Sequence, residues 1–406
     1  MRTNVVKKRK VKITGIGVVS PAGIGVLEFK KNILLGESYA CPITRFPREG
    51  GEFVAAEVRR FDQKNFSTNA IYSKVPRHTK FALAATELAL RDSGIKAHEI
   101  GSLAPMVITG TSLMDSEVVS QTITNVTKKG PRYALARVVF QGPVSSVSSA
   151  VAGAIGGART LTIQSACCSG LDAIGHGAEL IGSGESDFAI CGGSEAPLFY
   201  HPMLELKSAG LSPSTSENFK EICRPFDLWR TTGVIGEGAC VCVLEPESSP
   251  RSGYAIIGGY GYSTDYPSDP DMGLPHAIEL CLANAETKPV EIDAISAWGP
   301  GHKEIDAMEA NSIHRVFGAL ANRIPVCSIK GAIGNPFAAA GALQVGTAAL
   351  GIRDSFLPAT VNWKRRDPKC DLSLASSARF FKQSKVLVNS HGVSGTNACM
   401  VLQRCE

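Results

Sequence analysis

The sequence lacks the features of membrane, secreted and metal-binding proteins. No apolar run approaches the roughly 18 residues that a membrane-spanning helix needs, and the basic N-terminal stretch VVKKRKVKITGIG contains no apolar signal core. We therefore expect a cytoplasmic protein without a membrane span. No pair of C-x-x-C units with nearby histidines occurs, so we predict no metal site and no bound cofactor.

A strong charge of one sign is also missing. The chain has 42 Lys and Arg against 37 Asp and Glu, a net charge of +5. So small an excess does not indicate nucleic-acid binding, but it suits an acidic macromolecular partner. Cysteine, by contrast, is plentiful. Most of the 12 cysteines lie at irregular spacings inside apolar runs, which predicts reduced core thiols: Cys191, Cys240, Cys242, Cys281 and Cys399 are examples.

The pattern along the chain alternates between strand-like and helix-like segments. KVKITGIGVV is typical of a strand, and TKFALAATELALRDSG carries apolar residues at helical spacing. The same alternation resumes after the hydrophilic turn PESSPRSG at 246–253. We predict an α/β protein with two βαβ-rich halves, residues 1–248 and 249–406, each built on a sheet that is mostly parallel.

One segment combines a buried-type strand, two adjacent cysteines and an amphipathic helix: TIQSACCSGLDAIGHG, residues 162–177. A thiol at the start of a helix meets unpaired N–H groups and the helix dipole, both of which favour the thiolate. The same N–H groups can bind the oxyanion of a thioester under attack. The residues alone leave two interpretations open, a nucleophile or a pair of small buried side chains.

The longer stretch SACCSGLDAIGHGAELIGSGESDFAICGGSEA resembles the active-site segment of the β-ketoacyl-acyl-carrier-protein synthases, condensing enzymes of the thiolase superfamily. RPFDLWRTTGVIGEGACVCVLE, SIKGAIGNPFAAAGAL and VNSHGVSGTNACMVL resemble further blocks of that family, in the same order. The resemblance implies a thiolase-like fold, two pseudo-symmetric halves in an α-β-α-β-α layered sandwich. It also implies Cys167 as the nucleophile, Cys168 as a packing residue, and an oxyanion hole made by the backbone N–H groups of Cys167 and Val393.

Both active-site histidines of the elongating family members are replaced in this chain. Trp298 stands in one loop and Asn335 in the other, while Asp306 and Glu309 keep the family spacing. Both replacements offer N–H donors for an oxyanion, but neither titrates near neutrality. The indole is also bulky enough to occupy the space of a malonyl group. We therefore expect acylation of Cys167, its pKa lowered by the helix start, and we doubt conventional malonyl decarboxylation.

Two other histidines are candidates for a relocated base or donor. His391 takes the place of the first phenylalanine in the family's C-terminal turn and is the stronger candidate; His302 stands where a threonine is usual. Val393 replaces the second, gating phenylalanine, which predicts a wider entrance. Five charged residues match framework positions of the family, with Lys330 and Glu309 expected nearest the chemistry: Arg224, Asp227, Glu237, Glu309 and Lys330.

Family members bind acidic acyl carrier proteins, and Lys74, Arg77 and Lys80 occupy the corresponding basic region. We favour an acyltransferase of the 3-oxoacyl-synthase type, in specialised fatty acid or polyketide-type synthesis, that takes its chain from a carrier protein or coenzyme A. Two alternatives stay open: a chain-length-factor-like partner subunit, and an ordinary elongating ketosynthase. A homodimer, or a heterodimer with a related synthase, is expected.

Overall fold

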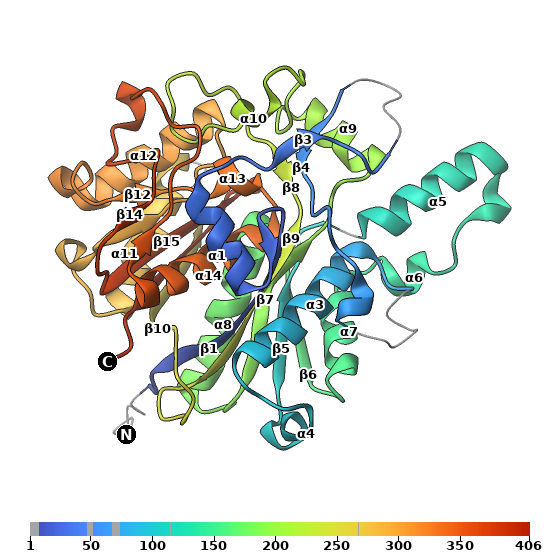
Figure 1. Ribbon diagram of the computed structural model, residues 1–406, viewed down its shortest axis with the longest axis horizontal. Helices are drawn as coiled ribbons and strands as arrows, with labels where there is room; N and C mark the ends of the chain where they lie inside the picture. The colour runs from blue at the N-terminus through green and yellow to red at the C-terminus, as the bar shows by residue number, and fades with distance from the viewer. Residues whose placement is uncertain (1–7, 47–51, 67–73, 114, 267) are drawn as a thin grey trace.

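The computed structural model describes residues 8–46, 52–66, 74–113, 115–266 and 268–406. Two five-stranded halves of one mixed sheet form its centre, flanked by helices (Figure 1). The first half has the strand order β6-β5-β7-β9-β1, and the second has β10-β16-β15-β11-β12. The bounds are β1 Val11–Ser20, β5 Met106–Gly110, β6 Arg159–Ile163, β7 Ala189–Glu195, β9 Gly238–Pro246, β10 Ala255–Thr264, β11 Ala294–Ser296, β12 Val326–Cys327, β15 Lys385–Gly392 and β16 Thr396–Gln403.

The pairing pattern of one half repeats in the other. β1–β9 and β9–β7 are antiparallel, and β7–β5 and β5–β6 are parallel. The second half matches this pair for pair, antiparallel from β10 through β16 to β15 and parallel from β15 through β11 to β12. β1 and β10 join the halves antiparallel at Val11–Ile13. The pseudo-symmetry predicted from the sequence is confirmed, but the prediction of mostly parallel sheets was wrong, because two of the four pairings in each half are antiparallel.

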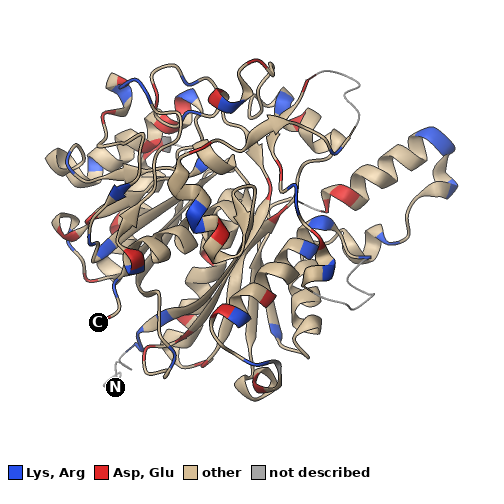
Figure 2. Cartoon of the chain, viewed as in Figure 1, with Lys and Arg blue, Asp and Glu red and all other residues tan. Residues whose placement is uncertain are grey.

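Helices fill the layers between and outside the half-sheets. α8 (Ser169–Ser183) and α14 (Ala338–Asp354) pack against each other and form the middle layer, and both are almost entirely buried. α3 (Arg77–Asp92) and α7 (Ser146–Ala154) cover the first half, and α11 (Gly273–Asn284) and α12 (Lys303–Phe317) cover the second. This is the layered α/β sandwich that the sequence predicted. Charged residues lie mainly on the outer helices and loops (Figure 2).

Close approach of α8 and α14 brings their N-terminal ends together. A Cβ atom at Gly170 would lie 2.4 Å from the carbonyl oxygen of Ala338, and one at Gly341 would lie 2.7 Å from the Cβ of Leu171. Only glycine lets the two backbones pass at this distance. The residue before α8 and the loop before α14 therefore meet at one end of the middle layer.

The remaining elements are short or lie at the periphery. They are α1 (Val26–Leu35), α4 (Ala97–Ile100), α5 (Ser116–Lys129), α6 (Val138–Gln141), α9 (Tyr200–Ser208), α10 (Phe219–Ile222), α13 (Lys330–Ile333), β2 (Gly23–Ile24), β3 (Ala40–Pro42), β4 (Val54–Ala56), β8 (Ile235–Gly236), β13 (Phe356–Leu357) and β14 (Arg379–Phe380). Helix α5 projects away from the body (Figure 1). None of the helices in the described ranges is long and apolar enough to cross a membrane.

Candidate active site

Cys167 lies in a tight turn between β6 and α8. Ala166 adopts a left-handed conformation with φ of 52°, and residues 166–168 form a single 3-10 turn that leads into the helix. Ser169 Oγ holds this turn: it donates to the carbonyl of Ala166 at 2.6 Å and accepts from the N–H of Ser165 at 2.9 Å. A non-glycine residue in the left-handed region costs about 1 kcal/mol or more in backbone strain. The surrounding contacts therefore hold Ala166 in a conformation that it would not adopt by itself.

Side chains at the β15–β16 hairpin, in the other half of the molecule, hold the turn at Cys167 by hydrogen bonds. Thr396 Oγ1 donates to the carbonyl of Ser165 at 2.9 Å, and Ser390 Oγ donates to the carbonyl of Cys167 at 3.3 Å. The backbone N–H of Val393 is directed at the Cys167 sulfur. Cys168 donates its S–H to the carbonyl of Thr396 at 3.4 Å. Of the two adjacent thiols, Cys167 is therefore the one directed toward Asn335 and the N–H of Val393.

Asn335 reaches the sulfur from the second half of the molecule. Its Nδ2 lies 4.0 Å from Cys167 Sγ, the outer limit for a hydrogen bond to sulfur. Its backbone is fixed on both sides, because its N–H donates to Val234 at 2.7 Å and its carbonyl accepts from Gly236 at 2.9 Å. The Oδ1 atom is buried and has no hydrogen-bond partner among the described residues. The amide thus has unused hydrogen-bonding capacity in the site.

Glu309 clamps the loop that carries Trp298. Its two carboxylate oxygens accept from the N–H groups of Trp298 at 2.8 Å and Gly299 at 2.7 Å. The indole is only 1% exposed, and its Nε1 has no partner in the described part of the chain. Trp298 packs in one apolar cluster with Cys167, Ile235 and Phe337. A buried N–H donor therefore stands beside the thiol, without a partner.

Lys330 is fully buried below the site. Its ammonium donates to Gln344 Oε1, and Gln344 Nε2 in turn binds the carbonyls of Ala297 at 2.9 Å and Asn389 at 3.0 Å. Burial lowers the pKa of Lys330 to about 8, opposed by the nearby Glu309 carboxylate and the Cys167 thiol. Burial likewise raises the pKa of Glu309. Gln344, which the sequence reasoning missed, links the lysine to the strand ends that hold the site.

Burial also has the largest effect on the pKa of the Cys167 thiol. The residue is fully buried, and burial raises its pKa to about 11, against the lowering effects of Asn335, Lys330 and the Val393 N–H. The expectation that the helix start lowers the pKa of this thiol was therefore wrong: desolvation of the anion outweighs the donors. Cys167 is therefore a thiol at neutral pH that lies among N–H donors.

A narrow opening leads toward this cluster from the surface. Its free volume is about 20 Å³, room for about one water molecule, and its walls include Trp298, Asn335, Phe337, Val393 and Thr232. The predicted wider entrance at Val393 is not found, because Trp298 and Phe337 fill the space. Phe337 has a φ of 45° and stands immediately before α14. Strain at this position, like that at Ala166, could not be read from residue types.

The two candidate histidines have different surroundings in the structure. His391 Nδ1 donates to Asn397 Oδ1 at 2.6 Å, and its ring centre lies 5.2 Å from that of Trp298. Within the described part of the chain, no hydrogen bond joins His391 to the Cys167 sulfur. His302 instead lines the opening with Trp298 and Asn335, and its buried Nδ1 has no partner within the described residues. Burial lowers the pKa of His302. His302 is therefore better placed than His391 to meet an entering group.

Three framework residues form ion pairs: Arg224, Asp227 and Glu237. The partner of Glu237 is Arg77, which the sequence predicted as a docking residue. Arg224 pairs with Asp227 at 3.1 Å. The Arg77 guanidinium pairs with Glu237 at 2.6 Å and also donates to the carbonyl of Val58 at 2.8 Å, with only 14% of its side chain exposed. Because that charge is already neutralised, Arg77 is unsuited to docking. Lys74 is exposed and Lys80 is partly exposed.

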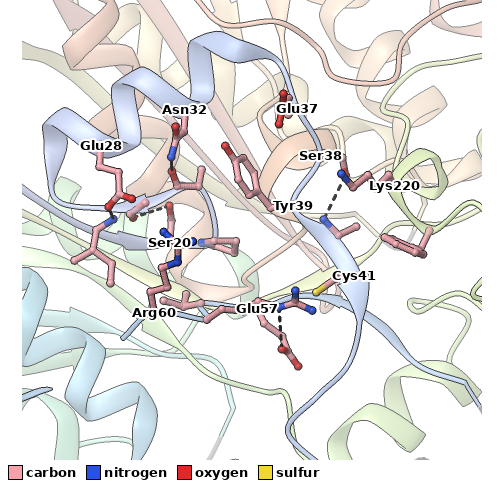
Figure 3. A pocket seen from close by; sticks show the side chains of 18 of the residues that line it. Ser20, Glu28, Asn32, Glu37, Ser38, Tyr39, Cys41, Glu57, Arg60 and Lys220 are labelled. Atoms are coloured by element: carbon pink, nitrogen blue, oxygen red, sulfur yellow. Dashed lines mark hydrogen bonds and ion pairs between the residues drawn. The ribbon is translucent and has the colours of Figure 1, made fainter. Parts of the chain in front are cut away.

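A larger cavity of about 690 Å³ lies elsewhere, between α1, β3 and the segment around Arg59 (Figure 3). Two of its carboxylates already have partners within the protein. Glu28 accepts from the N–H of Ile24 at 3.0 Å, and Glu57 pairs with Arg59 at 3.6 Å. Within the described ranges, no group of three or more His, Cys, Asp or Glu residues is placed to hold a metal ion. The Cys167 cluster therefore remains the candidate active site.

The fold and this cluster together define a condensing enzyme of the thiolase superfamily. The N-terminal domain model of the β-ketoacyl synthases matches residues 8–249, and the C-terminal domain model matches residues 252–364. The chain belongs to the β-ketoacyl synthase family.

Individual relatives cover nearly the whole chain. It is 33% identical to a 3-oxoacyl-[acyl-carrier-protein] synthase 2 of Coxiella burnetii, over 98% of this chain and 99% of that protein. It is 29% identical to a putative polyketide beta-ketoacyl synthase 1 of Streptomyces cyaneus, over 97% and 98%. Among solved structures, the ishigamide ketosynthase/chain length factor superposes with a TM-score of 0.92 at 30% identity, covering 98% of this chain and 100% of that one.

A second solved structure contains a carrier protein. A chain of the AntDE:AntF complex, described as a type II acyl-carrier protein with its ketosynthase bound to the hexaketide, superposes with a TM-score of 0.87 at 28% identity. It covers 98% of this chain and 100% of its own. The family and the thiolase-like fold are thus established by sequence and by structure.

Proposed function

We propose that this chain is an acyltransferase of the β-ketoacyl synthase family in which Cys167 receives an acyl chain from an acyl carrier protein or coenzyme A thioester. The observation that carries the proposal is the environment of the sulfur. Cys167 faces the N–H groups of Val393 and Asn335, and no imidazole is among its contacts in the described part of the chain. The chain supports fatty acid or polyketide-type synthesis, as its named relatives do.

The transfer needs no external proton acceptor overall. The Cys167 sulfur attacks the thioester carbonyl, and the new oxyanion accepts from the backbone N–H groups of Cys167 and Val393. When the carbon–sulfur bond of the donor breaks, the departing arm thiolate takes the proton that Cys167 gave up. Lys330 adds positive potential, and Glu309 keeps the Trp298 loop in register as a positioning residue.

Conventional condensation is disfavoured in this site. Decarboxylation of a malonyl thioester builds an enolate, which elongating members of the family stabilise through two histidines. Here Trp298 Nε1 and Asn335 Nδ2, neither of which titrates near neutrality, are the available donors in place of the imidazoles. The opening of about 20 Å³ admits an acyl chain or a malonyl group only when Trp298 or Phe337 moves, so the difference between the two reactions lies in the donors. We therefore expect decarboxylation and condensation to be slow relative to acylation.

A second candidate function is that of a chain-length-factor-like subunit beside an active synthase. The similarity to the ishigamide ketosynthase/chain length factor supports it. So does the edge strand β6, which lies at the end of the sheet with Leu161 41% exposed and could pair with another chain. The retained and well-positioned Cys167 favours the acyltransferase. Homodimer or heterodimer formation stays a prediction.

Intact mass spectrometry tests the proposal. The native protein, Cys167→Ala and Cys168→Ala are each incubated with an octanoyl carrier protein. We expect one octanoyl group on the native protein and on Cys168→Ala, and none on Cys167→Ala. Because Cys168 faces Thr396 rather than the site, it is the matched control. The absence of any adduct would overturn the acyltransferase proposal and favour the non-catalytic subunit.

A further inference from the structure

A groove of about 500 Å³ lies beside the catalytic opening, next to α9 and α10. Thr232 lines both spaces, so the groove and the opening above Trp298 and Asn335 are neighbours. Hydroxyl groups dominate the groove wall, among them those of Ser212 and Thr231. Ser212 is only 4% exposed, and its Oγ has no hydrogen-bond partner in the described ranges. A buried, unpartnered hydroxyl in a groove wall points to a polar ligand that the groove receives.

Two neighbouring large apolar side chains are exposed here, and one of them, Trp229, lines the groove. Leu228 is 47% exposed and Trp229 is 55% exposed. The Asp227 carboxylate holds the loop that carries both residues. Its Oδ1 accepts from the N–H of Trp229 at 3.0 Å, and its Oδ2 accepts from the N–H groups of Lys364 and Arg365 at 2.7 Å each. The rim is therefore rigid before anything binds to it, which reduces the entropy cost of docking.

Basic side chains surround the exposed indole. The Arg365 guanidinium lies 4.9 Å from the centre of the Trp229 ring, and Arg224 lies 5.7 Å from it. Lys364 and Arg366 are exposed on either side; they pair with Glu221 at 2.9 Å and with Asp371. No carboxylate is recorded as a partner of the Arg365 guanidinium within the described residues. Its charge is thus available to a partner.

We propose that Leu228, Trp229 and Arg365 form the anchor on which an acidic acyl carrier protein docks, with the groove guiding its acyl-bearing arm past Thr232 to Cys167. The inference rests on the proposed function. Trp and Arg are the residue types that most often anchor protein interfaces, and a positive rim is complementary to an acidic partner. Thr232 follows Trp229 by three residues, so at most about 11 Å of chain separates the anchor from the catalytic opening.

This surface differs from the docking set predicted from sequence. Arg77 is bound to Glu237, which leaves Lys74, in the turn before α3, and Lys80, on α3. Neither segment contributes to the walls of the groove or the opening. The anchor lies on the RPFD block and on the basic run KRRDPK at 364–369, which the sequence reasoning did not single out. Its recognition required the fold, because 137 positions separate Leu228 from Arg365 (365 minus 228).

Carrier-protein affinity tests the inference directly. Binding of the host's acyl carrier protein, loaded with an octanoyl thioester, is measured by fluorescence anisotropy at low salt. The full-length chain is compared with Trp229→Ala and Arg365→Glu. We expect Kd to rise at least about tenfold in each variant, and the salt dependence of binding to flatten in Arg365→Glu. Phe380→Ala and Lys382→Glu are matched exposed controls on another element, expected to change Kd less than about twofold.

Two results would overturn the inference. Unchanged affinity in both folded variants would do so, in particular if Lys74→Glu or Lys80→Glu weakened binding instead. Undetectable binding by the native chain would do so as well. The proposed function is tested separately on the native protein with octanoyl-N-acetylcysteamine, which carries no protein. Failure to acylate Cys167 with this small thioester would overturn the acyltransferase proposal, whereas carrier affinity reports on docking alone.

Discussion

Replacing both unusual residues with histidine, Trp298→His with Asn335→His, is expected to raise the rate of malonyl decarboxylation on the order of 100-fold over the native protein. Imidazoles at these positions would supply the paired N–H donors that an enolate oxygen needs, and general acid–base groups contribute roughly 10²–10⁴-fold. The smaller ring would also enlarge the opening of about 20 Å³. Release of labelled carbon dioxide from malonyl carrier protein measures the effect.

Two control variants separate the chemical effect from the steric one. Trp298→Ala with Asn335→Ala enlarges the opening without adding an imidazole, and we expect it to gain little. Trp298→Phe keeps an aromatic ring, although a smaller one, and removes the Nε1 donor. If the alanine pair released carbon dioxide as fast as the histidine pair, the missing imidazoles would not be what limits the native site.

Removing the Glu309 carboxylate should be the most damaging single change for stability. Glu309→Leu leaves the N–H groups of Trp298 and Gly299 unpaired in the core. It also removes the carboxylate that stabilises the charge of the buried Lys330. Breaking a buried charged network of this kind costs about 3–5 kcal/mol. Urea unfolding should show that loss, and release of the Trp298 loop should slow acylation of Cys167 at least about tenfold.

Glu304, on the exposed side of the same helix, provides the comparison. Glu304→Leu should change the free energy of unfolding by less than about 0.5 kcal/mol. Glu309→Gln should fall between the two, because the amide oxygen can still accept one of the two N–H bonds. Equal stability of Glu309→Leu and Glu304→Leu would mean that the Trp298 loop does not depend on this clamp.

Local sequence patterns predicted the framework of this molecule well. The strand, tight turn and helix around Cys167 follow from small residues flanking two thiols and an apolar helical stripe. The pseudo-symmetric layers followed from the resemblance to a known family. The mixed sheet was missed because buried antiparallel strands such as β9 and β16, covered on both faces, have the continuous apolar character usually associated with parallel strands.

Properties that depend on burial were not predictable from the residues alone. The helix start at Cys167 suggested a lowered pKa, yet the enclosing side chains of Trp298 and Phe337 desolvate the thiol and raise it. His391 was favoured over His302 from its place in the turn, but its Nδ1 is held by Asn397. Side-chain direction decides such cases, and it is fixed by contacts between segments far apart in the sequence.

The central claim is that Cys167 accepts an acyl chain without help from an imidazole, and the pH dependence of its acylation tests this most directly. The rate of octanoyl transfer from octanoyl-N-acetylcysteamine is measured from pH 5.5 to 9.5 in the native protein and in His391→Phe. Because the folded-state pKa of Cys167 is about 11, the thiolate fraction and the rate should rise throughout this range without an inflection near pH 6–7. His391→Phe should follow the same profile within about threefold. An inflection near neutrality in the native protein would contradict the account, whether or not His391→Phe abolishes it.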